Sequence, residues 1–181
     1  MGQAINIDPD STLFDTEGMF YKEFSSDYRQ IRYYTLIVLQ KAPSEIKELN
    51  LLEQQLSEII KNAVKHGNKK DPEKKVRIWY KFSSQDARII IEDEGEGFQN
   101  IEEWNEFNKK RLEYFKENNF EKLADYVSYR TAKSDDSDGG NALFAAVEYW
   151  NGGFVYNDKR NKVAAYKTFP KRHHRINGQE E

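Results

Sequence analysis

Apolar positions recur with a helical period in two early segments of the chain. Between 27 and 41, behind Asp27 as the N-cap, the pattern predicts a helix with an apolar stripe of Ile31, Tyr34, Val38 and Leu39. A second helix is predicted from Ser44, as its cap, to Gly67, as its C′ residue. Its apolar face comprises Leu49, Leu52, Leu56, Ile59, Ile60 and Ala63.

Alternation of apolar and polar residues predicts strands elsewhere. Residues 76–82 and 87–93 flank a short polar turn and predict a hairpin, and 154–156 with 163–169 predict a second one. Residues 19–24 predict a first, edge strand.

Asp93 continues an apolar face of its strand. Alternation places it on the same side as Ile89 and Ile91. A carboxylate in that position is costly without a partner. We therefore expect Asp93 to have a partner.

The remaining segments are a loose N-terminal arm (1–17), a helix at 142–150 and a disordered tail (170–181). Between 99 and 138, aromatic residues are embedded among charged ones, with helical spacing at 102–118 and 121–129. Helices and hairpins in this order predict an α+β fold, a two-layer α/β sandwich with helices on one face of a mostly antiparallel sheet.

Composition narrows the classes of function. The 181 residues are 38% hydrophobic, 14% aromatic and 33% charged, which is typical of a globular domain with a charged surface. The net charge of −3 predicts no general attraction to nucleic acid, and the absence of cysteine excludes disulfides and thiol nucleophiles. With no signal pattern and no apolar run of about 18 residues, we expect a cytoplasmic protein without a membrane partner.

Two short motifs carry the candidate chemistry. Glu58 and Asn62 lie at i and i+4 on one face of the second predicted helix, ahead of Gly67. A carboxylate beside an amide oxygen suits hydrated Mg²⁺ and a proton acceptor near a phosphate. The second motif, Asp93-Glu-Gly-Glu-Gly97, directly follows an apolar strand. Together they predict a nucleotide site.

These motifs resemble those of the GHKL ATPase superfamily, which includes gyrase, histidine kinases and anti-sigma-factor serine kinases. The form Glu-x-x-x-Asn-x-x-x-His-Gly is most similar to the anti-sigma kinases, and the resemblance spans about residues 20–169. It implies a Bergerat-type ATP-binding fold, with Asn62 on Mg²⁺, Glu58 as general base and Asp93 on the adenine amino group. Gly95 and Gly97 match the two glycines of the second motif.

A third motif of the family is a glycine box that opens a helix and holds phosphate oxygens. Its best match here is Gly140-Asn141-Ala142-Leu143-Phe144, preceded by Gly139, and Ala142 stands where a glycine is expected.

The segment 99–138 corresponds to the family's ATP lid and is longer than in compact anti-sigma kinases. We expect a helical lid insertion within one domain, 18–169. Helix is expected between about 102 and 129, with a hinge at 130–138.

The resemblance implies an ATP- and Mg²⁺-dependent serine/threonine kinase that phosphorylates or sequesters a regulatory protein. Its partner would be an anti-anti-sigma-type substrate, a sigma factor or both, and a homodimer is an open alternative. Two other functions stay open. One is a stand-alone histidine-kinase-like ATPase domain. The sequence shows no helix with a phosphoacceptor histidine, which argues against this alternative. The other is a nucleotide-binding regulatory module without kinase activity, which Ala142 favours.

Overall fold

A six-stranded sheet forms one layer of the molecule. The computed structural model describes residues 4–126 and 142–170. The strand order is β1-β5-β6-β4-β3-β2, and every neighbouring pair is antiparallel except β1 and β5, which are parallel. The strands are β1 (Asn6–Ile7), β2 (Phe20–Ser25), β3 (Lys75–Phe82), β4 (Asp86–Glu92), β5 (Gly153–Tyr156) and β6 (Lys162–Thr168).

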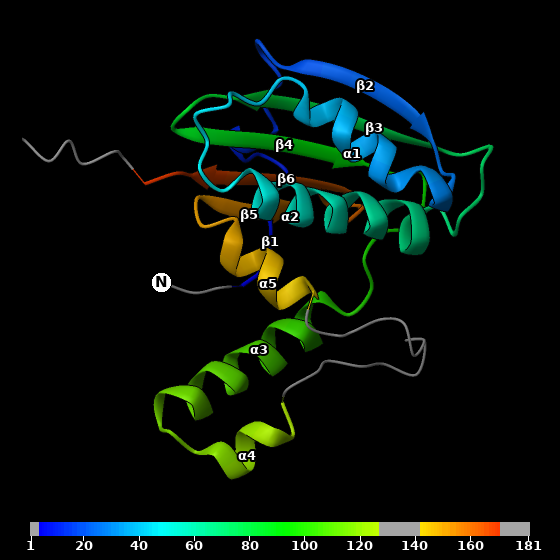
Figure 1. Cartoon of the computed structure of the whole chain (residues 1–181). Coiled ribbons are helices and arrows are strands. Elements are labelled where there is room, and N and C mark those ends of the chain that lie inside the picture. Colours follow the sequence, from blue (N-terminus) through cyan, green and yellow to red (C-terminus); the bar gives the residue numbers. More distant parts are fainter. Residues whose placement is uncertain (1–3, 127–141, 171–181) are drawn as a thin grey trace, which may run out of the picture.

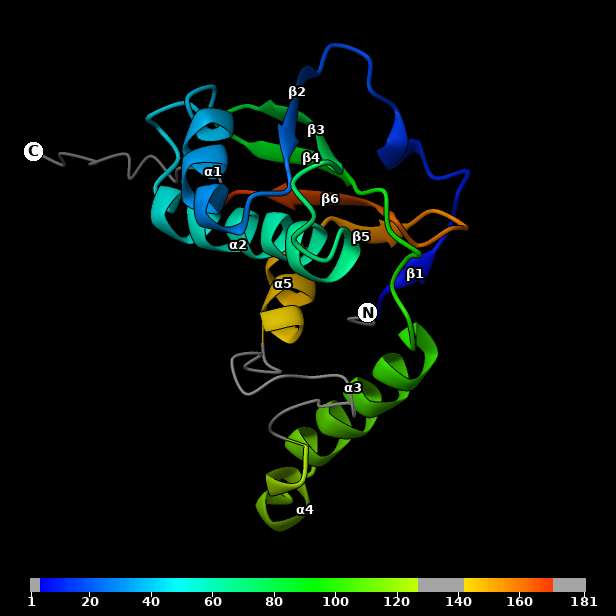
Figure 2. The same cartoon turned by 90° about the vertical axis from the view of Figure 1, so that its right-hand side faces the viewer.

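Helices α1 (Ile31–Leu39), α2 (Leu49–Asn62) and α5 (Ala142–Tyr149) cover one face of this sheet (Figure 1). Helices α3 (Ile101–Lys116) and α4 (Phe120–Ala124) extend away from it, which is clearest in the rotated view (Figure 2). The predicted α+β sandwich, with a mostly antiparallel sheet, is confirmed. None of the helices in the described ranges is both long and apolar enough to cross a membrane.

The main core lies between the sheet and α2. Leu52, Leu56 and Ile60 of α2 have no exposed surface, and they belong to the same apolar cluster as Ile89 and Ile91 of β4. The alternate residue of β4, Ile90, points to the other face, which Leu13, Phe14 and Met19 help to cover. β4 is therefore apolar on both sides, and its end is held firmly where the second motif begins.

The starts of both early helices differ from the prediction. Asp27 accepts a hydrogen bond from the Arg29 N–H, but it caps a 3₁₀ turn, Tyr28–Gln30, that precedes α1. Ser44 caps no helix, because α2 begins only at Leu49. The intervening turn buries Ile46, which is 3% exposed, against the core, and this demand overrides the capping signal.

The segment predicted as a loose arm, 1–17, contains β1 and a 3₁₀ turn, Thr12–Phe14. Its anchor is Ile5, which is 2% exposed and bonded through both of its backbone polar groups to the Asn105 side chain of α3, at 2.9 and 2.8 Å. A two-residue strand has too few positions to show alternation, so the pattern gave no signal for it.

The helices predicted between 102 and 129 are present as α3 and α4 as far as residue 126. The expected hinge at 130–138 and the glycine-box residues Gly139, Gly140 and Asn141 lie outside the described residues. So does the tail from 171 onward, where disorder was predicted.

Candidate functional site

A cavity of about 360 Å³ lies between the end of α2, the loop after β4, the first turns of α3 and α5, and the β5–β6 turn. It brings together six of the predicted site residues: Glu58, Asn62, Asp93, Gly97, Ala142 and Leu143. Gly95 is not part of the lining and packs behind Asp93 against the backbone of Gly67. The two motifs, although about 30 residues apart, thus share one cavity.

Helix α2 continues past Asn62 as a π-helical turn, Ala63–Gly67. The N–H of Asn68 donates to the carbonyl of Ala63, five residues back, at 2.8 Å. Gly67 was predicted as the C′ residue, just outside the helix, but it is the last residue of the π turn and Asn68 is the C-cap. The residues with left-handed backbone are Lys69 and Lys70, with φ of 55° and 60°. π turns widen a helix locally and are frequent at functional sites.

Gly67 is required here for space. A Cβ at this position would lie 2.3 Å from the Asp93 carboxyl carbon, and one at Gly95 would lie 2.2 Å from the Gly67 carbonyl oxygen. Contacts this short do not occur between real side-chain atoms, so both residues must lack one. The end of the first motif therefore packs directly on the second.

Asp93 is held through its backbone and its side chain. Its N–H donates to the Asn161 carbonyl and its own carbonyl accepts from Asn161 Nδ2, both at 2.9 Å, while Oδ1 accepts from the Gly95 N–H at 2.8 Å. Burial raises the pKa of Asp93 to about 6, with a smaller contribution from Glu92. Burial and the Asp93 charge also raise the pKa of Tyr156, which lines the same cavity.

The β5–β6 turn supports the rest of the second motif. Gly97 has a φ of +92°, a left-handed conformation that favours glycine, and its missing Cβ leaves room for the Lys159 carbonyl. The Phe98 N–H donates to the Arg160 carbonyl at 2.8 Å. Arg160 also forms an ion pair of 2.6 Å with Glu102, so the same turn fixes the first turn of α3.

Glu58 and Asn62 lie on the α2 wall of the cavity and are both half-buried. The Glu58 carboxylate is 3.8 Å from the ammonium group of Lys61, which also lines the cavity. Within the described ranges no group of three or more His, Cys, Asp or Glu side chains is arranged to hold a metal. The donor set suits Mg²⁺, which keeps several waters and takes one or two protein oxygens together with substrate phosphates.

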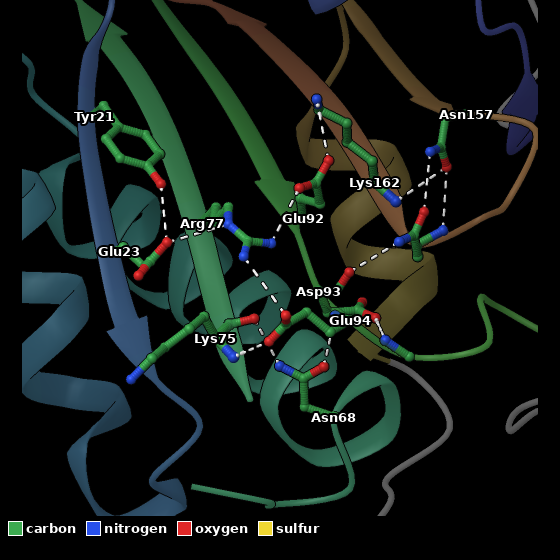
Figure 3. A network of polar contacts seen from close by, with 12 residues as sticks. Tyr21, Glu23, Asn68, Lys75, Arg77, Glu92, Asp93, Glu94, Asn157 and Lys162 are labelled. Carbon is green, nitrogen blue, oxygen red and sulfur yellow. Dashed lines mark hydrogen bonds and ion pairs between the residues drawn. The ribbon is translucent and has the colours of Figure 1, made fainter. Parts of the chain in front are cut away.

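Asn68 connects the two motifs, although the sequence did not single it out. It has no exposed surface, and its Nδ2 donates to Ser26 Oγ at 2.7 Å and to the Lys75 carbonyl at 2.8 Å. Its Oδ1 accepts from the Glu94 N–H at 2.7 Å (Figure 3). An asparagine among lysines after a helix is typical of an exposed turn, so the sequence pattern gives no indication that Asn68 links the two motifs.

Glu94 does not line the cavity and lies in a polar network with Lys75 and Arg77 (Figure 3). Its carboxylate accepts from the Lys75 N–H and lies 3.5 Å from Arg77, which also pairs with Glu23 and Glu92. The residue after Asp93 is thus fixed on both its backbone and its side chain, so the loop has little freedom to move Asp93.

We predict that Asn68→Ala lowers the free energy of unfolding by about 2–4 kcal/mol, because one buried and two partly buried hydrogen bonds are lost. Urea denaturation measures this loss. Asn50→Ala, at an exposed position of α2, is the matched control and is expected to stay within about 0.5 kcal/mol of wild type. A loss below about 1 kcal/mol for Asn68→Ala would contradict a connecting role.

We also predict a pH dependence due to Asp93. Because its pKa is raised from 3.8 to about 6, the native state binds more protons than the unfolded state in that window. Stability therefore falls as pH rises through the window, by up to about 3 kcal/mol for a shift of about two units. In the nucleotide-free protein, Asp93→Asn should lack this component. Parallel pH profiles of wild type and variant would refute the prediction.

The comparisons with known proteins agree with this geometry. The family model for the histidine kinase-like ATPase domain matches residues 25–147, more than half of the 181 residues. This range contains α1, α2, the β3–β4 hairpin, the second motif and most of α5. Among curated proteins, none matches the chain significantly. The chain belongs to the histidine kinase-like ATPase family.

Proposed function

We propose that this domain binds Mg-ATP and transfers the γ-phosphoryl group to a serine or threonine of a regulatory protein, as an anti-sigma-factor-type kinase. One observation carries the proposal: a single cavity collects the half-buried carboxylate of Asp93 together with Glu58 and Asn62. Family membership implies ATP binding. The kinase activity, Mg²⁺ and the partner are inferred from the residues.

The adenine would lie at the Asp93 end of the cavity. An exocyclic amine donates hydrogen bonds, and a carboxylate that already accepts from Gly95 through Oδ1 still has acceptor capacity. The apolar side chains of Ile91 and Val163 line the same cavity and suit a flat ring. Recognition of adenine would account for a half-buried carboxylate that by itself lowers the stability of the fold.

The phosphates would lie between Asn62 and the start of α5. Asn62 would hold Mg²⁺, and the bound ion would neutralise the negative charge of the phosphates. Ala142 and Leu143 begin α5 and line the cavity, so the first backbone N–H groups of this helix are available to phosphate oxygens.

Glu58 would act as the general base. Its carboxylate takes the proton of the serine or threonine hydroxyl as the oxygen bonds to the γ-phosphorus. The bond from that phosphorus to the bridging oxygen breaks, and ADP leaves with the electron pair. A position one turn from Asn62 suits this role, since the base must lie near the γ-phosphate.

The proposed partner is a small regulatory protein of a partner-switching system, an anti-anti-sigma-type substrate, a sigma factor or both. Sequestration of such a regulator requires binding but no phosphoryl transfer. We also propose that this chain can form a homodimer.

A second candidate function is a nucleotide-binding regulatory module without transfer. Ala142 favours it, since a methyl group lines the cavity where the family has a glycine. An experiment distinguishes the kinase from the nucleotide-binding module. A partner is captured by pull-down in the presence of ATP and is then incubated with the protein and labelled ATP. Label on the partner supports the kinase, and ATP binding without transfer supports the module.

Asp93→Asn is expected to weaken ATP binding at least about tenfold, because the amide places a donor against the adenine amine. Isothermal titration calorimetry measures the affinity. Asp158→Asn, on an exposed residue of the β5–β6 turn outside this cavity, is the control and should bind as wild type does. Equal affinity of Asp93→Asn and wild type would remove Asp93 from adenine recognition.

Glu58→Gln should lower the rate of phosphoryl transfer about 100-fold or more, the usual scale for a general base. Its ATP affinity should stay within a few-fold, since the residue faces the hydroxyl rather than the adenine. Glu53→Gln, on the same helix but away from the cavity, is the matched control. Transfer by Glu58→Gln at the wild-type rate would rule out this role.

A further inference from the structure

We propose that the hydroxyl of Tyr156 recognises the base of the nucleotide, by donating a hydrogen bond to a ring nitrogen of adenine next to the amino group that Asp93 binds. The inference deepens the proposed function and rests on it, because it assumes that an adenine nucleotide occupies the cavity. Tyr156 is the last residue of β5 and lies beyond the part of the chain that the family model matches.

The first observation is the place of Tyr156 in the wall of the cavity. Tyr156 pairs with Val163 of β6, and Val163 pairs with Ile91 of β4, so the three side chains form a row across one face of the sheet. All three line the cavity, and so does Asp93, two residues after Ile91. The sheet therefore presents a phenol and a carboxylate beside the same apolar surface.

The second observation concerns the hydroxyl itself. Tyr156 is 8% exposed, and its hydroxyl forms no hydrogen bond with any of the described residues. Unlike the hydroxyl of Tyr149, it is not fully enclosed by protein. The surface that a buried residue keeps where it lines a cavity faces that cavity, so a ligand there can supply the missing partner.

The third observation is that the phenol ring is held in place. Phe98, in the loop after the second motif, contacts it at a ring-centroid distance of 5.8 Å, and Phe154 of the same strand contacts it at 6.0 Å. The Phe98 N–H is itself bonded to the Arg160 carbonyl, so this loop is fixed to the β5–β6 turn. The hydroxyl is thus positioned before a ligand arrives, and little side-chain entropy is lost on binding.

A carboxylate and a phenol together match the hydrogen-bonding pattern of adenine. The amino group of adenine donates, and the ring nitrogens N1 and N7, on the two edges that meet at this group, accept. An ionised carboxylate only accepts, whereas a phenol can donate. Burial, together with the Asp93 charge, raises the pKa of Tyr156, so the phenol keeps its proton at neutral pH. Guanine carries a carbonyl oxygen in place of the amino group, which the Asp93 carboxylate would repel.

The experiment compares full-length wild type and Tyr156→Phe by calorimetry with ADP, 1-deaza-ADP and 7-deaza-ADP, the last two of which each lack one ring nitrogen. We expect Tyr156→Phe to bind ADP about 3- to 10-fold more weakly, the range for a hydrogen bond between neutral groups. One of the two deaza analogues should lack the accepting nitrogen. With that analogue, wild type and Tyr156→Phe should bind equally, because the same hydrogen bond is already lost.

Tyr149→Phe is the matched control. Tyr149 is 7% exposed and does not line the cavity, so this change removes a phenolic oxygen from a buried position away from the ligand. It should bind all three nucleotides as wild type does.

The outcomes separate this inference from the proposed function. Binding of ADP by wild type with no loss in Tyr156→Phe overturns the inference alone. A loss in Tyr156→Phe that persists undiminished with both deaza analogues shows that the hydroxyl contacts neither nitrogen and also overturns it, as does an equal loss in Tyr149→Phe. Failure of wild type to bind any adenine nucleotide overturns the proposed function and this inference with it.

Discussion

The packing of the Gly67 backbone on the Asp93 carboxylate is the constraint around which the cavity is arranged. No side chain fits between them, so both the end of α2 and the loop after β4 must approach without Cβ atoms. The π turn brings Gly67 to that position, and Asn68 then bonds to the loop that it faces. Asn161 holds Asp93 from the other side. Each of these contacts serves the placement of one carboxylate.

That placement has a cost in stability. A carboxylate beside Ile91 and Tyr156 loses hydration, and its raised pKa reports this loss. Such perturbed groups cluster at functional sites, because recognition requires polar groups where packing alone would not put them. The sheet supplies compensation nearby: β4 is buried on both faces, so the strand that carries Asp93 is among the most firmly held parts of the molecule.

The fold, and the elements that carry Glu58, Asn62 and Asp93 to one cavity, followed from sequence because they depend on periodicity and on residue type. The stripe on α2 and the alternation of β4 placed Glu58, Asn62 and Asp93 correctly relative to the core. What periodicity does not encode was missed. Ser44 has the residue type of a cap, but Ile46 is buried in a turn and the helix begins only at Leu49. Gly67 was predicted as the residue after the helix, but what requires a glycine there is the close approach of Asp93. Asn68 and Asn105 act through contacts with residues distant in sequence, which a single sequence does not reveal.

The bond between Ile5 and Asn105 has a consequence for how the protein folds. It joins positions 100 residues apart, whereas the β3–β4 hairpin closes over a short turn. Contacts between distant positions form slowly, because chain entropy must be lost before they contribute. By this argument the α3 wall of the cavity is completed after the β3–β4 hairpin, and the pairing of Asn6 in β1 with Val155 in β5, which joins still more distant positions, completes the sheet later again. During synthesis, the backbone of Ile5 cannot bond to Asn105 until more than half of the chain has been made.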